Sequence, residues 1–306
     1  MSSESRAQAV LLGQLIGDSL GSQVEFATAA EISEHHPGGV VDLADGGPFS
    51  LRAGQPTDDS EMALALARSI LRNGGFSVDD VLESYTRWAR SGPFDIGATT
   101  SAALMDHRRD GASQANGALM RICPLAIYMA PFPGETAEEL ARIDAALTHP
   151  NQLCQDINAV FVRVIAAAIY REYDRPAMLD AFREHSAGEV RDLIEASVVA
   201  PPAEFQESMG WVRIAFGNAI FELANGTSLE QSLIRTVGRG GDTDTNAAIC
   251  GALLGGLYGV QGLPRRWIDP VLSARADVYS PRPRPEEYWP VDAPDLALGL
   301  LRIATA

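Results

Sequence analysis

GGDTDTNAAICGALLGG, residues 240–256, joins two glycines and a cluster of carboxylates and hydroxyls to a run of small and apolar residues. The run after residue 246 has small residues where another helix could pack closely, so it predicts a buried core helix. Four consecutive side chains, at positions 242–245, carry oxygen, whereas a helix start needs only one cap. Gly240 and Gly241 lack Cβ atoms, so the backbone can turn tightly there and approach a ligand. The stretch therefore predicts a ligand site at the start of a core helix.

A second acidic cluster, Thr57-Asp58-Asp59, begins another small-residue helical run far away in the chain. Residues 55–67 and 240–261 contain no Lys or Arg. Carboxylates crowded in this way repel one another, and burying them without a partner is costly. A hard divalent cation would resolve the conflict, because Mg²⁺, Mn²⁺ and Ca²⁺ all bind carboxylate and hydroxyl oxygens. We interpret the two clusters as halves of one metal site.

The cluster at position 57 also has a purely structural interpretation. Asp58 could be the N-cap of a helix, with Glu61 three residues later completing a capping box. The two interpretations are compatible, because a helix start can also aim its first residues at an ion. Near the N-terminus, Asp18 and Glu25 are further acidic candidates, as ligands or as groups behind the ligands.

The composition limits the function. The chain has 306 residues, 46% of them hydrophobic, which is ample for a buried core, and its net charge is −16. This charge argues against binding to nucleic acid or to an anionic membrane, since both need basic patches. No segment approaches the roughly 18 consecutive apolar residues of a membrane span, and no basic segment precedes an apolar one at the N-terminus. We expect a cytoplasmic protein. All 24 basic residues are Arg, which excludes catalysis by lysine.

Helical periodicity dominates the sequence. The predicted helices span residues 7–20, 60–71, 78–89, 115–129, 151–170, 211–223, 229–237, 245–258 and 295–303. The only strand-like segment, residues 39–43, is short, and the Pro-rich segment 281–290 is expected to be a surface excursion. No repeat or long linker divides the chain. The pattern predicts a single all-α domain over residues 1–306.

Two further segments are candidates for ligand contact. Asn116-Gly117 opens a predicted helix, so backbone N–H groups there could hold a phosphate. Arg121 could add positive charge, although a structural salt bridge is the more common role of a single Arg. His149 lies in a tight turn, Thr148-His149-Pro150, before a long predicted helix, where a histidine is usually structural.

Six motifs occur in the order found in one family. They are Gly17-Asp18-Ser19-Leu20-Gly21, Thr57-Asp58-Asp59-Ser60, Asp95-Ile96-Gly97-Ala98-Thr99-Thr100, Asn116-Gly117-Ala118-Leu119-Met120-Arg121, Thr148-His149 and Gly240-Gly241-Asp242-Thr243-Asp244-Thr245. The chain, from about residue 11 to residue 259, resembles the ADP-ribosylglycohydrolases, in particular the type that reactivates ADP-ribosylated dinitrogenase reductase. The resemblance implies an orthogonal helical domain with two Mg²⁺ or Mn²⁺ ions at the bottom of an ADP-ribose cleft.

The same resemblance assigns the metal ligands. The implied ligands are Thr57, Asp58, Asp59, Asp242, Asp244 and Thr245. The first three would bind one ion, Asp242 and Thr245 would complete the site of the second, and Asp244 would be shared between the ions.

The resemblance also assigns catalytic and binding roles. Asp95 matches an acidic residue that takes part in proton transfer beside the scissile ribose, and Glu25 matches a catalytic or gating glutamate. The positions that line ribose and diphosphate match Asn116, Gly117 and His149. Gly240 and Gly241 are expected to approach the ligand, and Trp211 lies near where the family offers an aromatic ring to the adenine. A core tryptophan is an equal alternative for Trp211.

These assignments predict a hydrolase that removes ADP-ribose from arginine side chains of a modified protein. The segment from Gly92 to Asp95 fits the arginine-directed branch, whereas Ala98 stands where that branch has a polar residue. Residues 175–206 follow no pattern of the family and are expected to shape the rim that selects the target. The alternatives are a non-catalytic ADP-ribose- or protein-binding relative and a metal-dependent phosphoesterase. The expected partners are an ADP-ribosylated protein and, for an immunity protein, an ADP-ribosyltransferase toxin.

Overall fold

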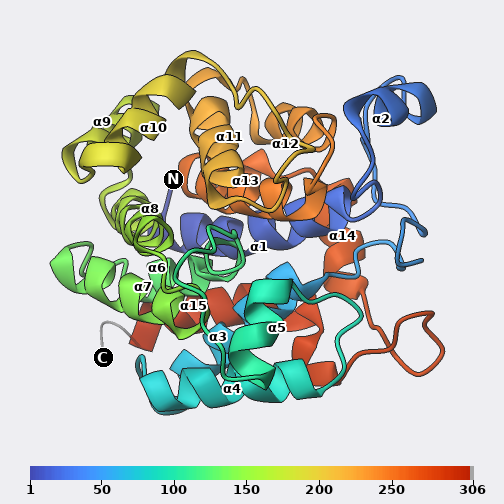
Figure 1. Ribbon diagram of the computed structural model, residues 1–306, viewed down its shortest axis with the longest axis horizontal. Coiled ribbons are helices and arrows are strands. Elements are labelled where there is room, and N and C mark those ends of the chain that lie inside the picture. Colours follow the sequence, from blue (N-terminus) through green and yellow to red (C-terminus); the bar gives the residue numbers. More distant parts are fainter. Residues whose placement is uncertain (304–306) are drawn as a thin grey trace.

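The computed structural model describes residues 1–303 and is all-α, as the periodicity predicts (Figure 1). No strand forms among these residues, and the segment 39–43 is irregular. The α-helices are α1 Ser3–Gly21, α2 Ala29–His35, α3 Asp58–Asn73, α4 Val78–Arg90, α5 Ala98–Met105, α6 Cys123–Tyr128, α7 Glu135–Thr148, α8 Gln152–Arg171, α9 Arg175–Glu184, α10 Gly188–Val199, α11 Val212–Asn225, α12 Leu229–Val237, α13 Thr243–Tyr258, α14 Arg265–Ser273 and α15 Ala293–Ile303.

Helices α1 and α13 pack against each other in the centre of the molecule, so closely that their backbones are in direct contact (Figure 1). A Cβ atom added at Gly17 would lie 2.1 Å from the Ala247 carbonyl oxygen, and one added at Gly251 would lie 2.0 Å from the Gly13 oxygen. Thr243 Oγ1 donates to the Gly21 carbonyl oxygen at 2.7 Å, so the end of α1 meets the start of α13. The core helix expected from the small residues of 247–256 is therefore confirmed, and its close partner is α1.

A single cluster of buried apolar side chains includes residues from α1 at the N-terminus to α15 at the end of the described chain. Helix α8 is the one described helix long and apolar enough to span a membrane, and 78% of its apolar window is buried inside the protein. That burial is typical of a core helix. The three cysteines are buried free thiols, as their apolar contexts predict.

Two local predictions are wrong around Glu61. The N-cap of α3 is Thr57 rather than Asp58, and it makes no side-chain capping bond. Glu61 instead accepts from Arg284 Nη2 at 2.7 Å and from Trp88 Nε1 at 2.7 Å. The Pro-rich segment 281–290 is consequently not a simple surface excursion, because it carries the Arg284 guanidinium into the core. The partner lies 223 residues away, so no local pattern reveals it.

The helix predicted over residues 115–129 is also wrong in its first half. Residues 116–118 form a turn, a short 3-10 helix covers Leu119–Arg121, and α6 starts only at Cys123 with Pro124 in its first turn. Pro124 lacks a backbone N–H, which suits a helix start. The helices α2, α5, α7, α9, α10 and α14 were not among the predicted ones.

Candidate active site

The start of α3 is held by Asp18, which lies near the end of α1 and is fully buried. Thr57 donates to the Asp18 carboxylate from its N–H at 3.1 Å and from Oγ1 at 3.0 Å, and Ser60 donates from Oγ at 2.5 Å. Burial raises the pKa of Asp18 to about 7, against the opposing effect of the hydrogen bonds from Ser60 and Thr57. These bonds fix the first turn of α3 relative to α1.

The two acidic clusters meet at Asp59. Thr245 Oγ1, on α13, donates to Asp59 Oδ2 at 3.2 Å, and Thr57 Oγ1 lies 3.3 Å from the same oxygen. The backbone N–H of Thr245 donates to Asp244 Oδ1 at 2.9 Å. Residues 186 positions apart in the chain are thus direct neighbours, which places both halves of the predicted site in one pocket.

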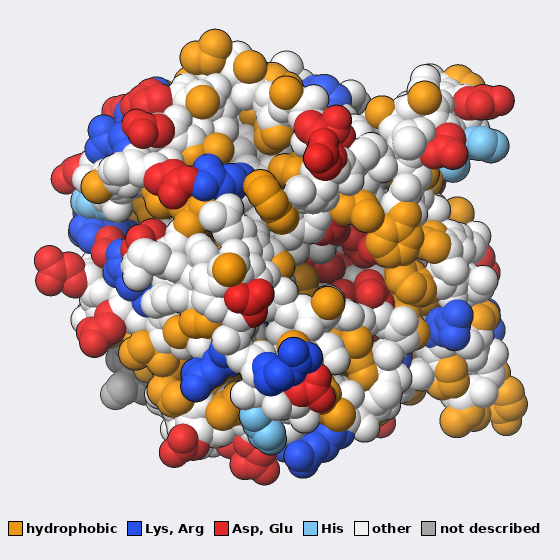
Figure 2. Space-filling view, in the orientation of Figure 1, with side chains coloured by type: hydrophobic (Ala, Val, Ile, Leu, Met, Phe, Trp, Pro, Cys, Tyr) orange, Lys and Arg blue, Asp and Glu red, His pale blue; other side chains and the backbone are white. Residues whose placement is uncertain are grey.

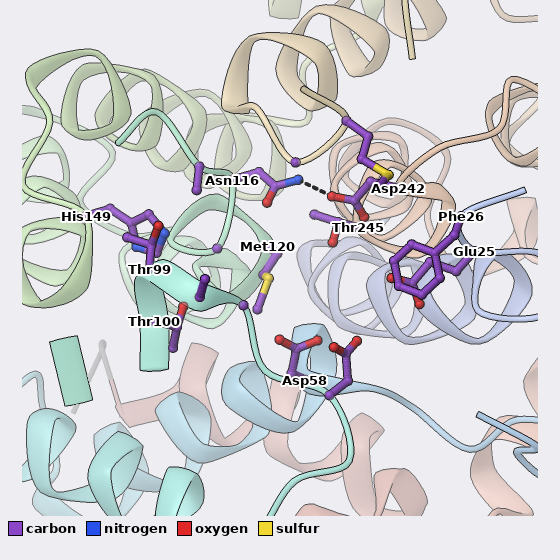
Figure 3. Close-up of a pocket in the computed structure, with 17 residues that line it drawn as sticks. Glu25, Phe26, Asp58, Thr99, Thr100, Asn116, Met120, His149, Asp242 and Thr245 are labelled. Atoms are coloured by element: carbon purple, nitrogen blue, oxygen red, sulfur yellow. Dashed lines mark hydrogen bonds between the residues drawn. The ribbon is translucent and has the colours of Figure 1, made fainter. Parts of the chain in front are cut away.

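A cleft with a volume of about 350 Å³ opens above these clusters (Figure 3). Glu25, Asp58, Asp95, Asp242 and Thr245 line it. Figure 2 shows the cleft as a recess with acidic side chains at its bottom. Ligand atoms of Glu25, Asp95 and Asp244 lie within 4.8 Å of one another. Asp95 comes from the segment between α4 and α5, and Glu25 from the segment between α1 and α2, so three separate parts of the chain converge on one point.

The carboxylates of this site have no arginine partner. Within residues 1–303, no ion pair forms at Asp18, Glu25, Asp58, Asp59, Asp95, Asp242 or Asp244. Burial, together with the charges of Asp95 and Asp242, raises the pKa of Glu25 to about 9, against the opposing effect of a hydrogen bond with Asp244. Burial also raises the pKa values of Asp58, Asp59 and Asp244 well above the ordinary range. The protein therefore concentrates carboxyl groups for which it supplies no cationic side chain.

Two buried oxygens at this point have no hydrogen-bond partner, Asp59 Oδ1 and Glu25 Oε2. Buried polar atoms are normally paired, so unpaired carboxylate oxygens beside threonine hydroxyls indicate a missing ligand. Oxygen-only donors are the set that hard divalent cations prefer. The residues fit a metal ion, and the buried acidic cluster could hold one.

A buried hydrogen-bond network supports the other end of the cleft. Arg121 Nη1 donates to Thr148 Oγ1 at 2.8 Å, and Arg121 also pairs with Asp144 at 3.1 Å. Thr148 Oγ1 lies 2.8 Å from His149 Nδ1. Because this oxygen accepts from Arg121, the Thr148 hydroxyl can donate its own hydrogen to Nδ1. Burial and the Arg121 charge lower the pKa of His149 to about 3. His149 is therefore neutral, and assigning the Thr148 hydroxyl hydrogen to Nδ1 puts the ring proton on Nε2, beside Gly117.

Asn116, Gly117 and His149 all line the cleft, as expected. The Asn116 side-chain amide donates to Asp242 Oδ2 at 2.7 Å, which joins this end to the acidic cluster. Arg121 lies in a structural salt bridge rather than in the cleft. Because Asn116-Gly117 lies in a turn, its backbone does not form the helix N-terminus that was predicted to hold a phosphate.

Three predicted ligand-contact residues do not line the cleft. Gly240 and Gly241 both have φ of +77°, and a Cβ at Gly241 would lie 1.8 Å from the Phe205 carbonyl oxygen. The glycines are thus explained by close approach of the protein's own backbone. Trp211 is 47% exposed and precedes α11, while its neighbours Met209 and Gly210 line the cleft.

The sequence reasoning did not assign several cleft residues. They are Phe26, Gly97, Ala98, Thr99, Thr100, Ala115, Met120, Met209 and Gly210. Thr99 and Thr100 belong to the motif that starts at Asp95, so the motif itself was the available signal. Phe26 follows the candidate Glu25 directly, but nothing in the sequence distinguishes an exposed phenylalanine from a core one.

The chain is all-helical and places unpaired buried carboxylates at the foot of a cleft. The sequence model of the ADP-ribosylglycohydrolase family matches residues 1–287, so the chain belongs to that family of glycohydrolases.

Individual relatives agree with this assignment. The ADP-ribosyl-dinitrogen reductase glycohydrolase of Rhodospirillum rubrum is 30% identical over 86% of this chain and 89% of its own length. An ADP-ribosylarginine hydrolase of Pseudomonas putida is 29% identical over 87% of this chain and 74% of its own. A solved ADP-ribosylglycohydrolase-related protein complex has a chain that is 28% identical, with a TM-score of 0.80 over 99% of both chains.

Proposed function

We propose that this protein hydrolyses the N-glycosidic bond between ADP-ribose and an arginine side chain of a modified protein. The observation that carries the proposal is the convergence of ligand atoms of Glu25, Asp95 and Asp244 within 4.8 Å of one another at the cleft. The name of the Pseudomonas putida relative, an ADP-ribosylarginine hydrolase, supports the arginine linkage, and that of the dinitrogen reductase glycohydrolase supports a modified protein as the substrate.

We further propose that the cluster holds two divalent cations, Mg²⁺ or Mn²⁺. Thr57, Asp58, Asp59, Asp242, Asp244 and Thr245 would hold them. Bound there, the cations would offset the carboxylate charge and polarise ribose oxygens near the scissile bond. The unpaired Asp59 Oδ1 is consistent with this role, because a hard cation satisfies such an oxygen.

The side chains of the cleft perform the proton transfer and the positioning. Water attacks the anomeric carbon, the bond to the guanidine nitrogen breaks, and the products are ADP-ribose and arginine. Asp95, half-buried in the cleft lining, accepts the proton that the water loses and passes it to the departing guanidine. Neutral His149 and the turn at Gly117 position the ribose and diphosphate, and Asn116 keeps Asp242 oriented.

The test compares two modified proteins, one carrying ADP-ribosyl-arginine and one carrying ADP-ribosyl-serine, with Mg²⁺ or Mn²⁺ present. We expect ADP-ribose to be released from the arginine-modified protein and not from the serine-modified one. A guanidine departs after modest proton assistance, whereas a serine alkoxide needs a stronger acid. Preferential release from serine would contradict the proposal. Tight binding of ADP-ribose without release from either protein would indicate a non-catalytic binding relative.

The cellular setting that we propose is the cytoplasm, with an ADP-ribosylated protein as partner and without nucleic acid or membrane. An ADP-ribosyltransferase toxin would be the opposing activity if the protein confers immunity. Co-expression with such a transferase tests this: the wild-type chain should restore growth, and an Asp95→Asn chain should not. A gene for this protein beside a nitrogenase cluster would instead favour a role in regulation.

A further inference from the structure

Three phenylalanines, Phe26, Phe49 and Phe94, form an aromatic rim that reaches the cleft through Phe26. The rings of Phe26 and Phe49 meet edge to face with centroids 6.2 Å apart, and those of Phe49 and Phe94 are 5.4 Å apart. Phe26 is 50% exposed and lines the cleft. Figure 2 shows hydrophobic side chains gathered beside the acidic recess. The rim therefore exposes the aromatic surface of Phe26 to whatever occupies the cleft, with Phe49 and Phe94 continuing that surface outward.

Phe26 is held in this exposed position by an unfavourable backbone conformation. Its φ is +69°, in the left-handed region that costs a non-glycine residue energy. The Phe26 N–H donates to the Gly241 carbonyl oxygen at 2.9 Å, and the Gly241 N–H donates to the Ala27 oxygen at 2.9 Å. The rim is thus anchored to the turn that starts the acidic cluster. Backbone strain of this kind is concentrated at functional sites.

The rim lies at the opposite end of the cleft from the polar pocket. In Figure 3, His149 and Thr99 occupy one end and Phe26 occupies the other, with Asp58 and Thr245 between them. Two of the three rim residues are chain neighbours of the candidate catalytic carboxylates, since Phe26 follows Glu25 and Phe94 precedes Asp95. A substrate whose ADP-ribose part fills the polar end would extend its leaving group toward the rim.

We infer that the aromatic rim binds the guanidinium of the arginine side chain from which ADP-ribose is removed. The inference rests on the proposed function and names the residues that recognise its leaving group. Aromatic faces attract cations, and guanidinium stacks on them well. The carboxylates of Glu25 and Asp95 beside the rim add charge complementarity. The alternative is that the adenine of ADP-ribose stacks on the rim, and the experiment below distinguishes the two ligands.

The rings are available for such a ligand. Among residues 1–303, the arginines that lie over aromatic rings do so at Tyr85, Phe205, Phe221, Trp267 and Tyr288, and none does so at the rim. Arg282 approaches Phe49 only through the backbone, donating from Nε to the Phe49 carbonyl oxygen at 3.0 Å. No cation of the described chain therefore competes for the faces of these three rings.

The test uses Phe49→Leu, which keeps an apolar side chain of similar reach and removes the π face. The matched control is Phe132→Leu, because Phe132 is 61% exposed and belongs neither to the rim nor to the cleft lining. The substrate is ADP-ribosylagmatine, whose leaving group is a guanidinium on a short chain that ends in an ammonium group, without any further protein surface. We expect Phe49→Leu to lower kcat/KM by about three- to thirtyfold, the range for loss of one cation–π contact. Affinity for ADP-ribose, measured by calorimetry, stays within about twofold of wild type in both variants.

A second measurement needs no variant. Agmatine should inhibit the wild-type enzyme as a product, whereas N-carbamoylputrescine, which keeps the ammonium group and carries a neutral urea in place of the guanidinium, should inhibit at least about fivefold more weakly, because the interaction with the rings requires the guanidinium charge. Equal inhibition by the two compounds would overturn the inference.

The outcomes distinguish a failure of the proposed function from a failure of this inference alone. Absence of ADP-ribosylagmatine cleavage by the wild type would overturn the proposed function and this inference with it. Cleavage that is unchanged in Phe49→Leu would overturn only the inference. Loss of ADP-ribose affinity in Phe49→Leu would also overturn it, and would assign the rim to the adenine.

Discussion

Thr245 Oγ1 donates to Asp59 Oδ2 across 3.2 Å, although 186 residues separate them in the chain. This bond joins the start of α13 to the start of α3, so two acidic helix starts form one pocket. Neither start brings an arginine, and one oxygen of Asp59 is left without a partner. The relationship is the structural basis for the proposed metal site, and the first prediction follows from it.

Asp244→Ala should remove Mn²⁺ binding more completely than Asp242→Ala. Asp244 lies within 4.8 Å of the ligand atoms of both Glu25 and Asp95, and it is the ligand expected to be shared between two ions. Asp242 is held by Asn116 at the edge of the cluster. Calorimetric titration with Mn²⁺ measures the difference, with Asp180→Ala as an exposed control. Equal losses in the two variants would argue against a shared ligand.

Asp95→Asn should separate binding from chemistry. The amide keeps the shape of the side chain and cannot accept the proton, so ADP-ribose affinity should stay close to that of the wild type. The rate of ADP-ribose release should fall by roughly 10²–10⁴, the usual contribution of general acid–base catalysis. Calorimetry with ADP-ribose and a release assay on an arginine-modified protein check both halves. Turnover at the wild-type rate would leave Asp95 with a structural role only.

Gly17→Ala should destabilise the protein and weaken the metal site together. Its Cβ would lie 2.1 Å from the Ala247 carbonyl oxygen, so α1 and α13 would have to separate. We expect a loss of about 1–3 kcal/mol in the free energy of unfolding. Gly111→Ala is the matched control, because its Cβ would meet nothing within 4 Å. Denaturant unfolding measures the effect, and a Gly17→Ala protein as stable as the control would contradict the packing described here.

The metal-free protein should lose stability as the pH rises. Burial raises the pKa of Asp18 to about 7 and that of Glu25 to about 9, from ordinary values near 4. The folded state then binds more protons than the unfolded state between these limits, so their contribution to stability is complete below about pH 4 and is lost as the pH climbs through 7 and 9.

Thermal unfolding in EDTA at pH 5 to 9 measures this decline. Mn²⁺ should restore more stability at pH 8 than at pH 5, because the ligands must be deprotonated. Glu25→Gln should flatten the upper part of the decline in the metal-free protein. A metal-free Tm that rises steadily from pH 5 to pH 9 would contradict the predicted sign.

Much of the fold could be predicted from local sequence. The small residues of 247–256 indicated a tightly packed core helix, and the glycines of α1 supply its partner surface. The turn at Asn116 could not be predicted in this way, because its geometry depends on a bond to Asp242, 126 residues later. Pro124 did carry a local signal for the start of α6 that the periodicity obscured.

The site was predictable where charge alone is informative. Two clusters without Lys or Arg indicated a shared oxygen-lined pocket, and Asp59 and Thr245 do lie together. The roles of Gly240 and Gly241 could not be predicted from local sequence, because the backbone that approaches them belongs to Ala27 and Phe205, which are distant in the chain. The aromatic rim was not predictable at all, since Phe26, Phe49 and Phe94 come from separate loops and meet only in the folded protein.

The most direct test of the central claim is the release of ADP-ribose from an arginine-modified protein by enzyme freed of metal and then reloaded. The account predicts no turnover after exhaustive chelation, verified by elemental analysis, and recovery on addition of Mg²⁺ or Mn²⁺ to the wild type but not to Asp244→Ala. Full turnover by the verified metal-free enzyme would contradict the claim that these two acidic clusters form one metal site.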